Sequence, residues 1–255
     1  MITTKRIGRA AAIDPFKRYQ PEVSQPVRKP DVKEDSKALQ AIKKVWRECG
    51  SIDSYDVLEA VERPYAKIFE HLKHLKYSAK DVERFSIALA EFQEEEGFAA
   101  KAGIFLSVLI NHAKGKNFRV CTRHLDVKPD GLGAFNTKNV VIDGDVDYGV
   151  GKLMISGSIT VNGNANVRAG FLMLGGTLTI NGNSGHDTGY GMAAGKIYVN
   201  GNIFPRYGDC GFLYHKGELI SSGPEATNVE EALGIALFSP SHVKVLAFLH
   251  ACSII

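Results

Sequence analysis

The residues whose types could take part in catalysis lie in one short segment, GNSGHDTGYGMAAG, at positions 182–195. Ser184, His186 and Asp187 are the residue types of a nucleophile, a general base and an orienting carboxylate. A catalytic triad is a spatial arrangement, and residues this close in sequence rarely form one. We therefore predict that His186 and Asp187 lie at a surface corner. The alternative is a polar contact site for a partner or ligand.

Two further reactive residues lie near this segment. His215 stands between Tyr214 and Lys216 and interrupts a glycine-rich run, so a surface corner is again favoured over a polar contact site. Cys210 ends the segment FPRYGDC, and none of its sequence neighbours favours a lowered pKa for its thiol. No catalytic residue is predicted at these positions.

Two glycine motifs resemble nucleotide-binding fingerprints. Gly189 to Ala194 reads GYGMAA and fits the GxGxxA pattern, which binds a dinucleotide only between a strand and a helix. Here the strand-like segment KIYVNG follows instead. Gly151-Lys152 is not a P-loop because Leu153 stands where the magnesium-binding Ser or Thr is needed. No cofactor is predicted.

The sequence does not predict a metal site either. His71 and His74 are three residues apart and would share a helix face, but zinc needs a third and usually a fourth ligand. The neighbouring Lys73 and Lys76 would repel a cation, so exposed surface histidines are favoured. The four cysteines form no CxxC pair, which is typical of scattered thiols in a reducing compartment. They are Cys49, Cys121, Cys210 and Cys252.

Composition limits the class of partner. The net charge is +3, which is too mild to indicate a nucleic-acid or membrane partner. No apolar run reaches the roughly 20 residues that span a bilayer. The stretch AAAI near the N-terminus is too short for a signal peptide. We therefore expect a soluble, cytoplasmic protein with neither kind of partner.

Glycine and proline divide the chain into an arm, a glycine-poor body and a glycine-rich body, and helix signals after the last coil add a C-terminal cap. Most of the 26 glycines lie in the second half, whereas prolines cluster near the N-terminus. A proline-rich, basic stretch is usually extended and poorly packed, so an arm draped over the protein or a neighbouring subunit is expected. The alternative is an arm that binds phosphate or an acidic partner. The predicted parts are a basic arm (1–34), an α-helical domain (35–118), a β-helix (119–223) and a C-terminal helical cap (224–255).

The second part has the periodicity of helices, because apolar residues recur there at spacings of three and four. Asp53 or Ser54 is predicted to cap one helix, and Pro64 to interrupt it. Ser78 with Asp81 resembles a capping box for the next. The nearly all-apolar segment FAAKAGIFLSVLINHAKG predicts the buried central helix of a bundle.

The glycine-rich part repeats itself. The phrases TVNGN, TINGN and YVNGN begin 19 residues apart, at positions 160, 179 and 198. A fixed period of about twenty residues indicates stacked structural units. Three glycine columns share the period: Gly144, Gly163, Gly182 and Gly201; Gly151, Gly170 and Gly189; and Gly157, Gly176 and Gly195.

Each unit contains short runs with alternating apolar residues, such as Ile159 and Val161, which predict strands with one face inward. Glycine fits the corners because tight turns need a positive φ or a close backbone approach. The sequence therefore predicts an α + β fold whose second half is a parallel β-helix of about five coils. Glycine runs resume at Gly211, Gly217 and Gly223, and a short segment, ELISSG, continues the pattern.

One polar column follows the same period. Asn and Asp tolerate left-handed turns, and stacked side-chain amides can form hydrogen-bonded ladders. After the last coil, segments 227–237 and 242–252 predict helices that cover one end, the first opened by a Thr227/Glu230 capping box. The polar column consists of Asp145, Asn164, Asn183 and Asn202.

The segments AGFLMLGGTLTINGNSG and GHDTGYGMAAGKIYVNGNI resemble the GXGXG β-helix of the glutamate synthase large subunit's C-terminal domain. They are also similar to the β-helical subunit of formylmethanofuran dehydrogenase. The resemblance covers about residues 130–223. It implies a right-handed β-helix that holds catalytic domains or subunits together and supplies no catalytic residue of its own.

The leading functional hypothesis is a non-catalytic assembly protein that holds together subunits or partners. One alternative is an accessory subunit of a glutamate synthase-like or formylmethanofuran dehydrogenase-like oxidoreductase complex. Another is a self-polymerising β-helix filament, similar to the bactofilins. A charge-poor stretch, 148–202, and several aromatic residues predict a homo-oligomer, most simply a closed dimer. These aromatic residues are Phe171, Tyr190, Tyr198, Phe212 and Tyr214.

Overall fold

The computed structural model describes residues 35–52, 59–204, 211–223, 226–237 and 241–255. The chain divides into two compact units, 1–34 and 35–255, and the described residues all belong to the second. The predicted basic arm, the cap at Asp53 or Ser54, and Cys210 therefore lie outside the described residues. The helices are α1 (Lys37–Glu48), α2 (Glu59–Leu72), α3 (Ala79–Ala88), the 3₁₀ helix η1 (Leu89–Phe92), α4 (Phe98–His112), α5 (Val229–Leu237) and α6 (Ser241–Ala251).

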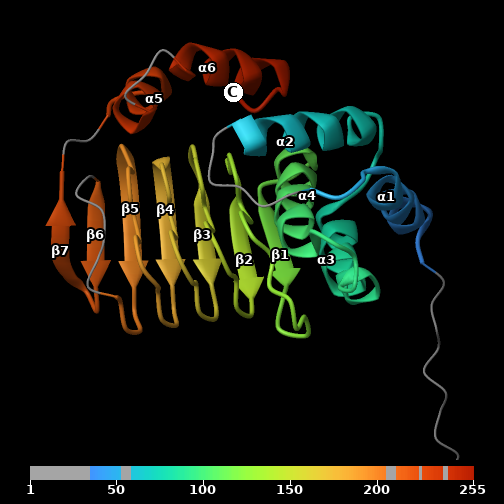
Figure 1. Cartoon of the computed structure of the whole chain (residues 1–255), viewed down its shortest axis with the longest axis horizontal. Helices are drawn as coiled ribbons and strands as arrows, with labels where there is room; N and C mark the ends of the chain where they lie inside the picture. The colour runs from blue at the N-terminus through green and yellow to red at the C-terminus, as the bar shows by residue number, and fades with distance from the viewer. Residues whose placement is uncertain (1–34, 53–58, 205–210, 224–225, 238–240) are drawn as a thin grey trace, which may run out of the picture. The chain divides into compact units, whose positions relative to one another are not determined.

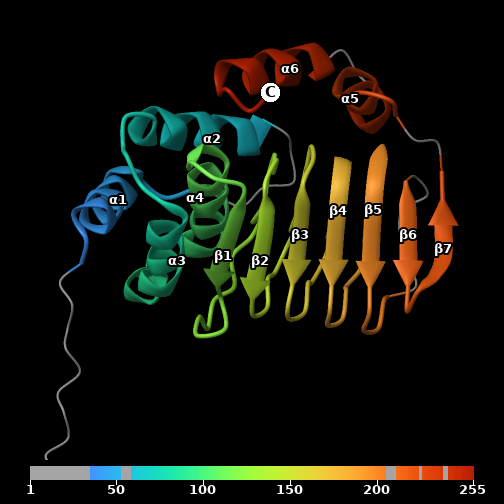
Figure 2. The same cartoon turned by 180° about the vertical axis from the view of Figure 1, so that it is seen from behind.

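Seven strands form one sheet in chain order, and β1 to β6 run parallel (Figures 1 and 2). Residues paired between β3 and β4 lie 19 positions apart, as in Ser158 with Thr177. The predicted parallel β-solenoid of about five turns is confirmed. The strands are β1 (Asn117–Cys121), β2 (Asn139–Asp143), β3 (Ser158–Val161), β4 (Leu174–Ile180), β5 (Ala194–Val199), β6 (Phe212–His215) and β7 (Glu218–Ser222).

The interior of the solenoid is built from stacked apolar residues. Ile159, Leu178 and Ile197 pair in register on successive strands, and each side chain is fully buried. The sequence also predicted a second short strand in each coil. In the structure a single residue in each coil takes its place and forms an isolated parallel β-bridge with the next coil. The apolar stack joins the helical core in one continuous cluster, so helices and solenoid share a core. The bridging residues are Val146, Ala165, Ser184 and Ile203.

Two constraints explain the glycine columns. A Cβ atom on Gly182, in the first column, would lie 2.5 Å from the carbonyl oxygen of Gly163 in the preceding coil. Gly170, in the second column, has a φ of 70°, which strains L side chains. The first column is therefore fixed by the close approach of stacked backbones, and the second by the local turn.

The predicted polar column forms a hydrogen-bonded ladder, named here the corner ladder (Asp145, Asn164, Asn183 and Asn202). In it the backbone N–H of each Asn donates to the side-chain Oδ1 one coil earlier. Asn183 N lies 2.9 Å from Asn164 Oδ1, and Asn202 N lies 2.8 Å from Asn183 Oδ1. Each side-chain oxygen therefore ties one coil to the next.

A second ladder, which sequence analysis missed, is named here the strand-end ladder (Asp143, Asn162, Asn181 and Asn200). Here the side-chain Nδ2 donates, and Asn181 Nδ2 lies 2.8 Å from Asn162 Oδ1. Asp143 begins the ladder, and the hydrogen bond from Asn162 and the nearby Arg119 lower the pKa of its carboxyl. The first Asn of each NGN phrase was the available signal.

The helical residues pack mainly around α4, whose side chains are almost all buried, as its apolar sequence predicted. The Ser78/Asp81 capping box of α3 is confirmed. The predicted interruption at Pro64 is wrong, because Pro64 lies inside a continuous α2. Val61, Tyr65, Ile68 and Leu72 bury one face of α2, and this burial offsets the hydrogen bond that proline cannot donate.

The two ends of the sheet differ. At the β1 end, α3 packs against the strand, and its buried Ser86 Oγ accepts a hydrogen bond from the N–H of Cys121 over 3.0 Å. At the other end, ELISSG does not continue the coil as predicted. Lys216 and Gly217 both have positive φ, which gives a two-residue hairpin turn, and β7 therefore returns antiparallel to β6.

The two predicted C-terminal helices are present. α5 packs against β4 and α6, and Phe248 of α6 contacts the rings of Tyr65 and Phe135. The predicted Thr227/Glu230 capping box is wrong by one residue. Asn228 Oδ1 accepts from the N–H of Glu231, whose carboxylate accepts from Thr227.

Candidate functional site

Ser184 and His186 lie in the same coil corner but contact different groups. Ser184 is buried, and its Oγ lies 2.6 Å from Oγ1 of Thr188. The exposed imidazole of His186 packs against Phe204, with the ring centroids 4.0 Å apart. Because the serine hydroxyl bonds to a threonine and the imidazole packs on a ring, these residues do not form a nucleophile–base pair here.

Asp187 belongs to a charged contact between coils. Its Oδ2 lies 3.5 Å from Nε of Arg168, and Nη1 of Arg168 donates to the hydroxyl of Tyr148 over 2.5 Å. Arg168 and Asp187 have φ values of 59° and 58°, the conformation that Gly149 adopts one coil earlier. Such a conformation is strained for residues with a side chain. The 19-residue period aligns both residues with Gly149, but no recurring glycine marks these positions, and the contact was not predicted from the sequence.

His215 lies at the end of β6, where the last parallel strand turns into the hairpin. Its Nε2 lies 2.9 Å from the carbonyl oxygen of Gly201, and its side chain is half-buried. His215 contacts a backbone carbonyl and His186 contacts an aromatic ring, so the two histidines do not belong to one site.

The nucleotide-like motifs lie in the solenoid turns. Gly189 and Gly191 have φ values of 72° and 68°, and strand β5 follows them. Lys152, of the second motif, is buried with its Nζ 5.1 Å from the centroid of the Phe171 ring. Neither motif precedes a helix, which is the context that phosphate binding needs.

The prediction that His71 and His74 share a helix face is wrong, because α2 ends at Leu72. Both imidazoles are exposed. Among the described residues, no group of three or more His, Cys, Asp or Glu side chains is placed to hold a metal ion.

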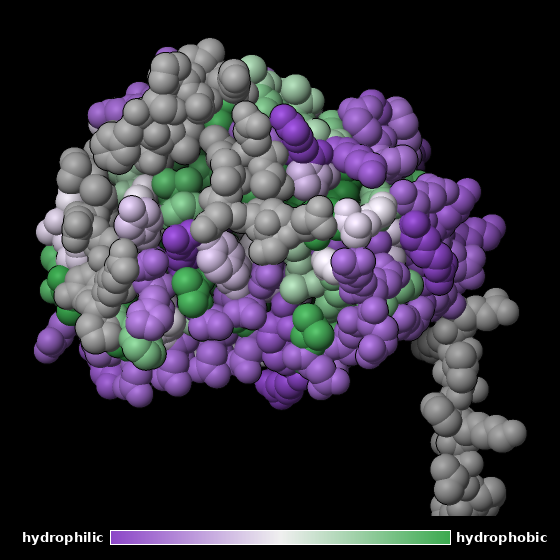
Figure 3. Space-filling view, in the orientation of Figure 1, coloured by the Kyte–Doolittle hydropathy of each residue, from purple (hydrophilic) through white to green (hydrophobic). Residues whose placement is uncertain are grey.

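A hollow lies along the second face of the solenoid, the face that carries the bridging residues. Two adjoining pockets of about 360 and 330 Å³ share Asn183, Ser184 and Phe204. Together they follow the bridging residues across successive coils, and we name them the corner groove. Figure 3 shows hydrophilic residues along the edge of the molecule where the strands end. The groove is also lined by Lys128, Asp145, Val146, Asp147, Asn164, Ala165, Asn166, Gly185, Asn202 and Ile203.

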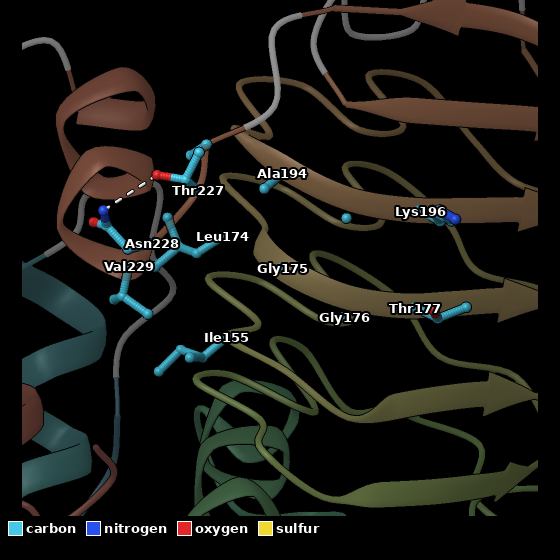
Figure 4. A pocket seen from close by; sticks show the side chains of 12 residues that line it. Ile155, Leu174, Gly175, Gly176, Thr177, Ala194, Lys196, Thr227, Asn228 and Val229 are labelled. Atoms are coloured by element: carbon cyan, nitrogen blue, oxygen red, sulfur yellow. Dashed lines mark hydrogen bonds between the residues drawn. The ribbon is translucent and has the colours of Figure 1, made fainter.

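A third pocket of about 410 Å³ lies between β4, β5 and the start of α5. Figure 4 shows Lys196 and Thr177 extending along the strands, away from Thr227 and Asn228. A helix N-terminus attracts anions, but the carboxylate of Glu231 already accepts from Thr227 in the first turn. The same hydrogen bonds lower the pKa of Glu231. The chain therefore supplies its own anion at this helix start.

A polar cluster lies among the helices. The buried hydroxyl of Tyr65 accepts a hydrogen bond from Nδ2 of Asn111 over 2.9 Å and lies 3.4 Å from Nε2 of His112. His112 also packs on Phe69, with ring centroids 4.3 Å apart. Burial, with a smaller effect of Lys138, lowers the pKa of His112 to about 4. The imidazole is therefore neutral in the folded protein at neutral pH.

This arrangement predicts acid sensitivity. Between pH 6.5 and about 4 the unfolded chain binds a proton at His112 that the folded chain excludes, so stability falls as pH falls through this window. Because the side chain is partly exposed, we expect about 1 kcal/mol from this group, less than the full pKa difference implies. His112→Gln should lose less stability than the unsubstituted protein over this range in urea titrations. Parallel pH profiles for the two proteins would contradict the assignment.

The described residues define a mixed α + β protein in which a parallel β-solenoid of about five turns is flanked by short helices. No protein-family model, curated protein or solved structure matches this chain. Within the described ranges, no helix is both long and apolar enough to cross a membrane.

Proposed function

We propose that this chain is a non-catalytic assembly protein that associates through the open end of its solenoid. The observation that supports this role is a row of side chains on the outward face of the sheet. It runs from Val141 on β2 through Thr160 on β3 and Thr179 on β4 to larger side chains on the last three strands. The row ends in Tyr198, Tyr214 and Leu219, which pair in register on β5, β6 and β7.

The apolar end of this row suits an interface. Tyr198 and Tyr214 stack with centroids 4.7 Å apart and an interplanar angle of 14°. Leu219 beside them is 50% exposed. Clustered aromatic and aliphatic side chains anchor protein interfaces when a partner removes them from water. We name this surface (Tyr198, Tyr214 and Leu219) the terminal patch.

The difference between the two ends favours a closed dimer over a filament. A filament needs two open ends that stack head to tail, and here α3 covers β1 through Ser86 and Cys121. In the described part of the chain β7 packs mainly on β6, and two such terminal strands can meet around a two-fold axis and close the assembly. The proposed partner is therefore a second copy of this chain.

Light scattering at micromolar concentration tests the proposal. We expect a mass about twice the 27.8 kDa of one chain. Leu219→Glu places a charge in the terminal patch and should reduce the mass to that of a single chain. The matched control is Ile87→Glu, because Ile87 is 53% exposed on α3 at the covered end. A single-chain mass for the unsubstituted protein, or equal masses for both variants, would reject the dimer.

A further inference from the structure

We propose that the corner groove binds a neutral oligosaccharide in an extended conformation. This activity goes beyond the proposed assembly role and uses a different surface from the terminal patch. The groove is continuous over several coils, because its two pockets share Asn183, Ser184 and Phe204. Stacked coils repeat at about 4.8 Å, close to the length of one hexose unit in an extended chain.

The floor of the groove offers few backbone groups to a ligand. Its bridging residues are Val146, Ala165 and Ser184, whose N–H groups donate to carbonyl oxygens of the next coil over 2.8–2.9 Å. Their side chains are buried. A peptide that bound as an added strand would need free backbone donors and acceptors at this floor. Recognition must therefore come from the side chains that flank it.

The flanking amides have unused donors. In the corner ladder, Asn183 and Asn202 use their Oδ1 atoms as acceptors, from Asn202 N–H and from Lys216 Nζ. Within the described part of the chain, no hydrogen bond occupies the Nδ2 group of either residue. Each amide nitrogen carries two N–H donors. The Nδ2 groups of Asn164 and Asn166 already donate to Asp145 and Asp147, so the unused donors lie on two adjacent coils, at Asn183 and Asn202, where they can reach the ring and hydroxyl oxygens of a sugar chain.

Acceptors and an aromatic surface complete the site. Asp145 and Asp147 line the same groove and can accept from sugar hydroxyls. Phe204 is 50% exposed and is held against the ring of His186. An exposed aromatic ring offers a flat apolar surface for the C–H face of a sugar. A saccharide has hydroxyl groups at its edge and C–H groups on the faces of its rings, so it can use both the polar side chains and the aromatic ring of this groove.

The charge of the groove disfavours an anionic ligand. Two carboxylates, Asp145 and Asp147, face a single cation, Lys128, among the lining residues that the structure describes. A nucleic acid or a polyuronate would meet net repulsion, since polyanions bind through clustered basic residues. A neutral chain carries no such penalty and satisfies both the amide donors and the carboxylate acceptors.

Two variants and a control test this site. Asn183→Asp retains the acceptor for Asn202 N–H, as Asp145 does in the same ladder, but removes the amide donor. Phe204→Ala removes the aromatic surface. Tyr190→Ala is the control, because Tyr190 is 48% exposed and its ring stacks on Phe171, whereas the ring of Phe204 packs on His186. All three substitutions are in exposed side chains, so the fold should persist.

The probes are cellohexaose, xylohexaose, mannohexaose and chitohexaose, titrated into the full chain by calorimetry or NMR. We expect at least one to bind, with affinity reduced about tenfold or more by Asn183→Asp and by Phe204→Ala and unchanged by Tyr190→Ala. A Ser-, Thr- and Gly-rich peptide is titrated in parallel. No binding by any hexaose, binding that all three variants share equally, or binding of the peptide alone would each overturn the proposal.

Discussion

Gly182→Val is expected to lower the free energy of unfolding by about 4 kcal/mol or more, a large effect for one substitution. The Cβ atom alone would lie 2.5 Å from the carbonyl oxygen of Gly163, and valine adds two methyl groups to that clash. The coils cannot separate to relieve it, because Gly182 N–H donates to the same oxygen over 2.9 Å. The backbone hydrogen bond between Gly182 and Gly163 must therefore break.

Thermal unfolding measures this effect, and a loss of that size corresponds to roughly 8 °C or more for a chain of this length. Lys196→Ala is the control, because Lys196 is exposed on β5 and its truncation should change stability by no more than about 0.5 kcal/mol. Equal melting temperatures for the two variants would show that the first glycine column is not fixed by stacking.

Asn181→Asp is expected to lower the free energy of unfolding by about 2 kcal/mol, because it removes the donor of one hydrogen bond in the strand-end ladder. Asn181 Nδ2 donates to Asn162 Oδ1 over 2.8 Å, and Asn181 Oδ1 accepts from Asn200 Nδ2 over 2.8 Å. Aspartate retains the second bond but places an anionic oxygen against the oxygen of Asn162. Two acceptors then face each other with no proton between them.

The matched control is Asn183→Asp, two residues away in the corner ladder. There the backbone N–H is the donor and the side chain only accepts, so aspartate should be tolerated within about 0.5 kcal/mol. Urea unfolding of both variants checks this difference. Below about pH 4 the protonated carboxyl introduced by Asn181→Asp could donate again, so the gap should narrow. A larger loss of unfolding free energy for Asn183→Asp than for Asn181→Asp would contradict the assigned directions of these hydrogen bonds.

The solenoid was predictable because its signals reinforce one another. The inward positions of β3, β4 and β5 alternate, the glycines recur at one spacing, and each signal gives the same register. The corner ladder was predictable for the same reason. The strand-end ladder and the Arg168–Asp187 contact follow the same period but were missed, because neither is marked by a recurring glycine.

The ends of the solenoid were less predictable. The ELISSG segment has the composition of another coil, and the positive φ of both Lys216 and Gly217 reverses the chain just before it. Pro64 is a helix breaker by local rules, yet the burial of Tyr65 and Ile68 beside it keeps α2 continuous. The corner groove depends on which side chains the coils align, and Phe204 lies in a column with Asp147, Asn166 and Gly185 that shares no residue type.

The one-way donation in the strand-end ladder gives the solenoid a polarity that its near-identical coils conceal. Asp143 only accepts, so it fits the first position, whereas the middle positions, Asn162 and Asn181, each donate and accept, and Asn200 at the last position donates. Duplicating a coil that carries Asn would extend the solenoid by one more turn. Copying the coil that carries Asp143 into the middle would place a carboxylate where an amide must donate. Lengthening of this fold by gene duplication is therefore restricted to the coils that follow the first.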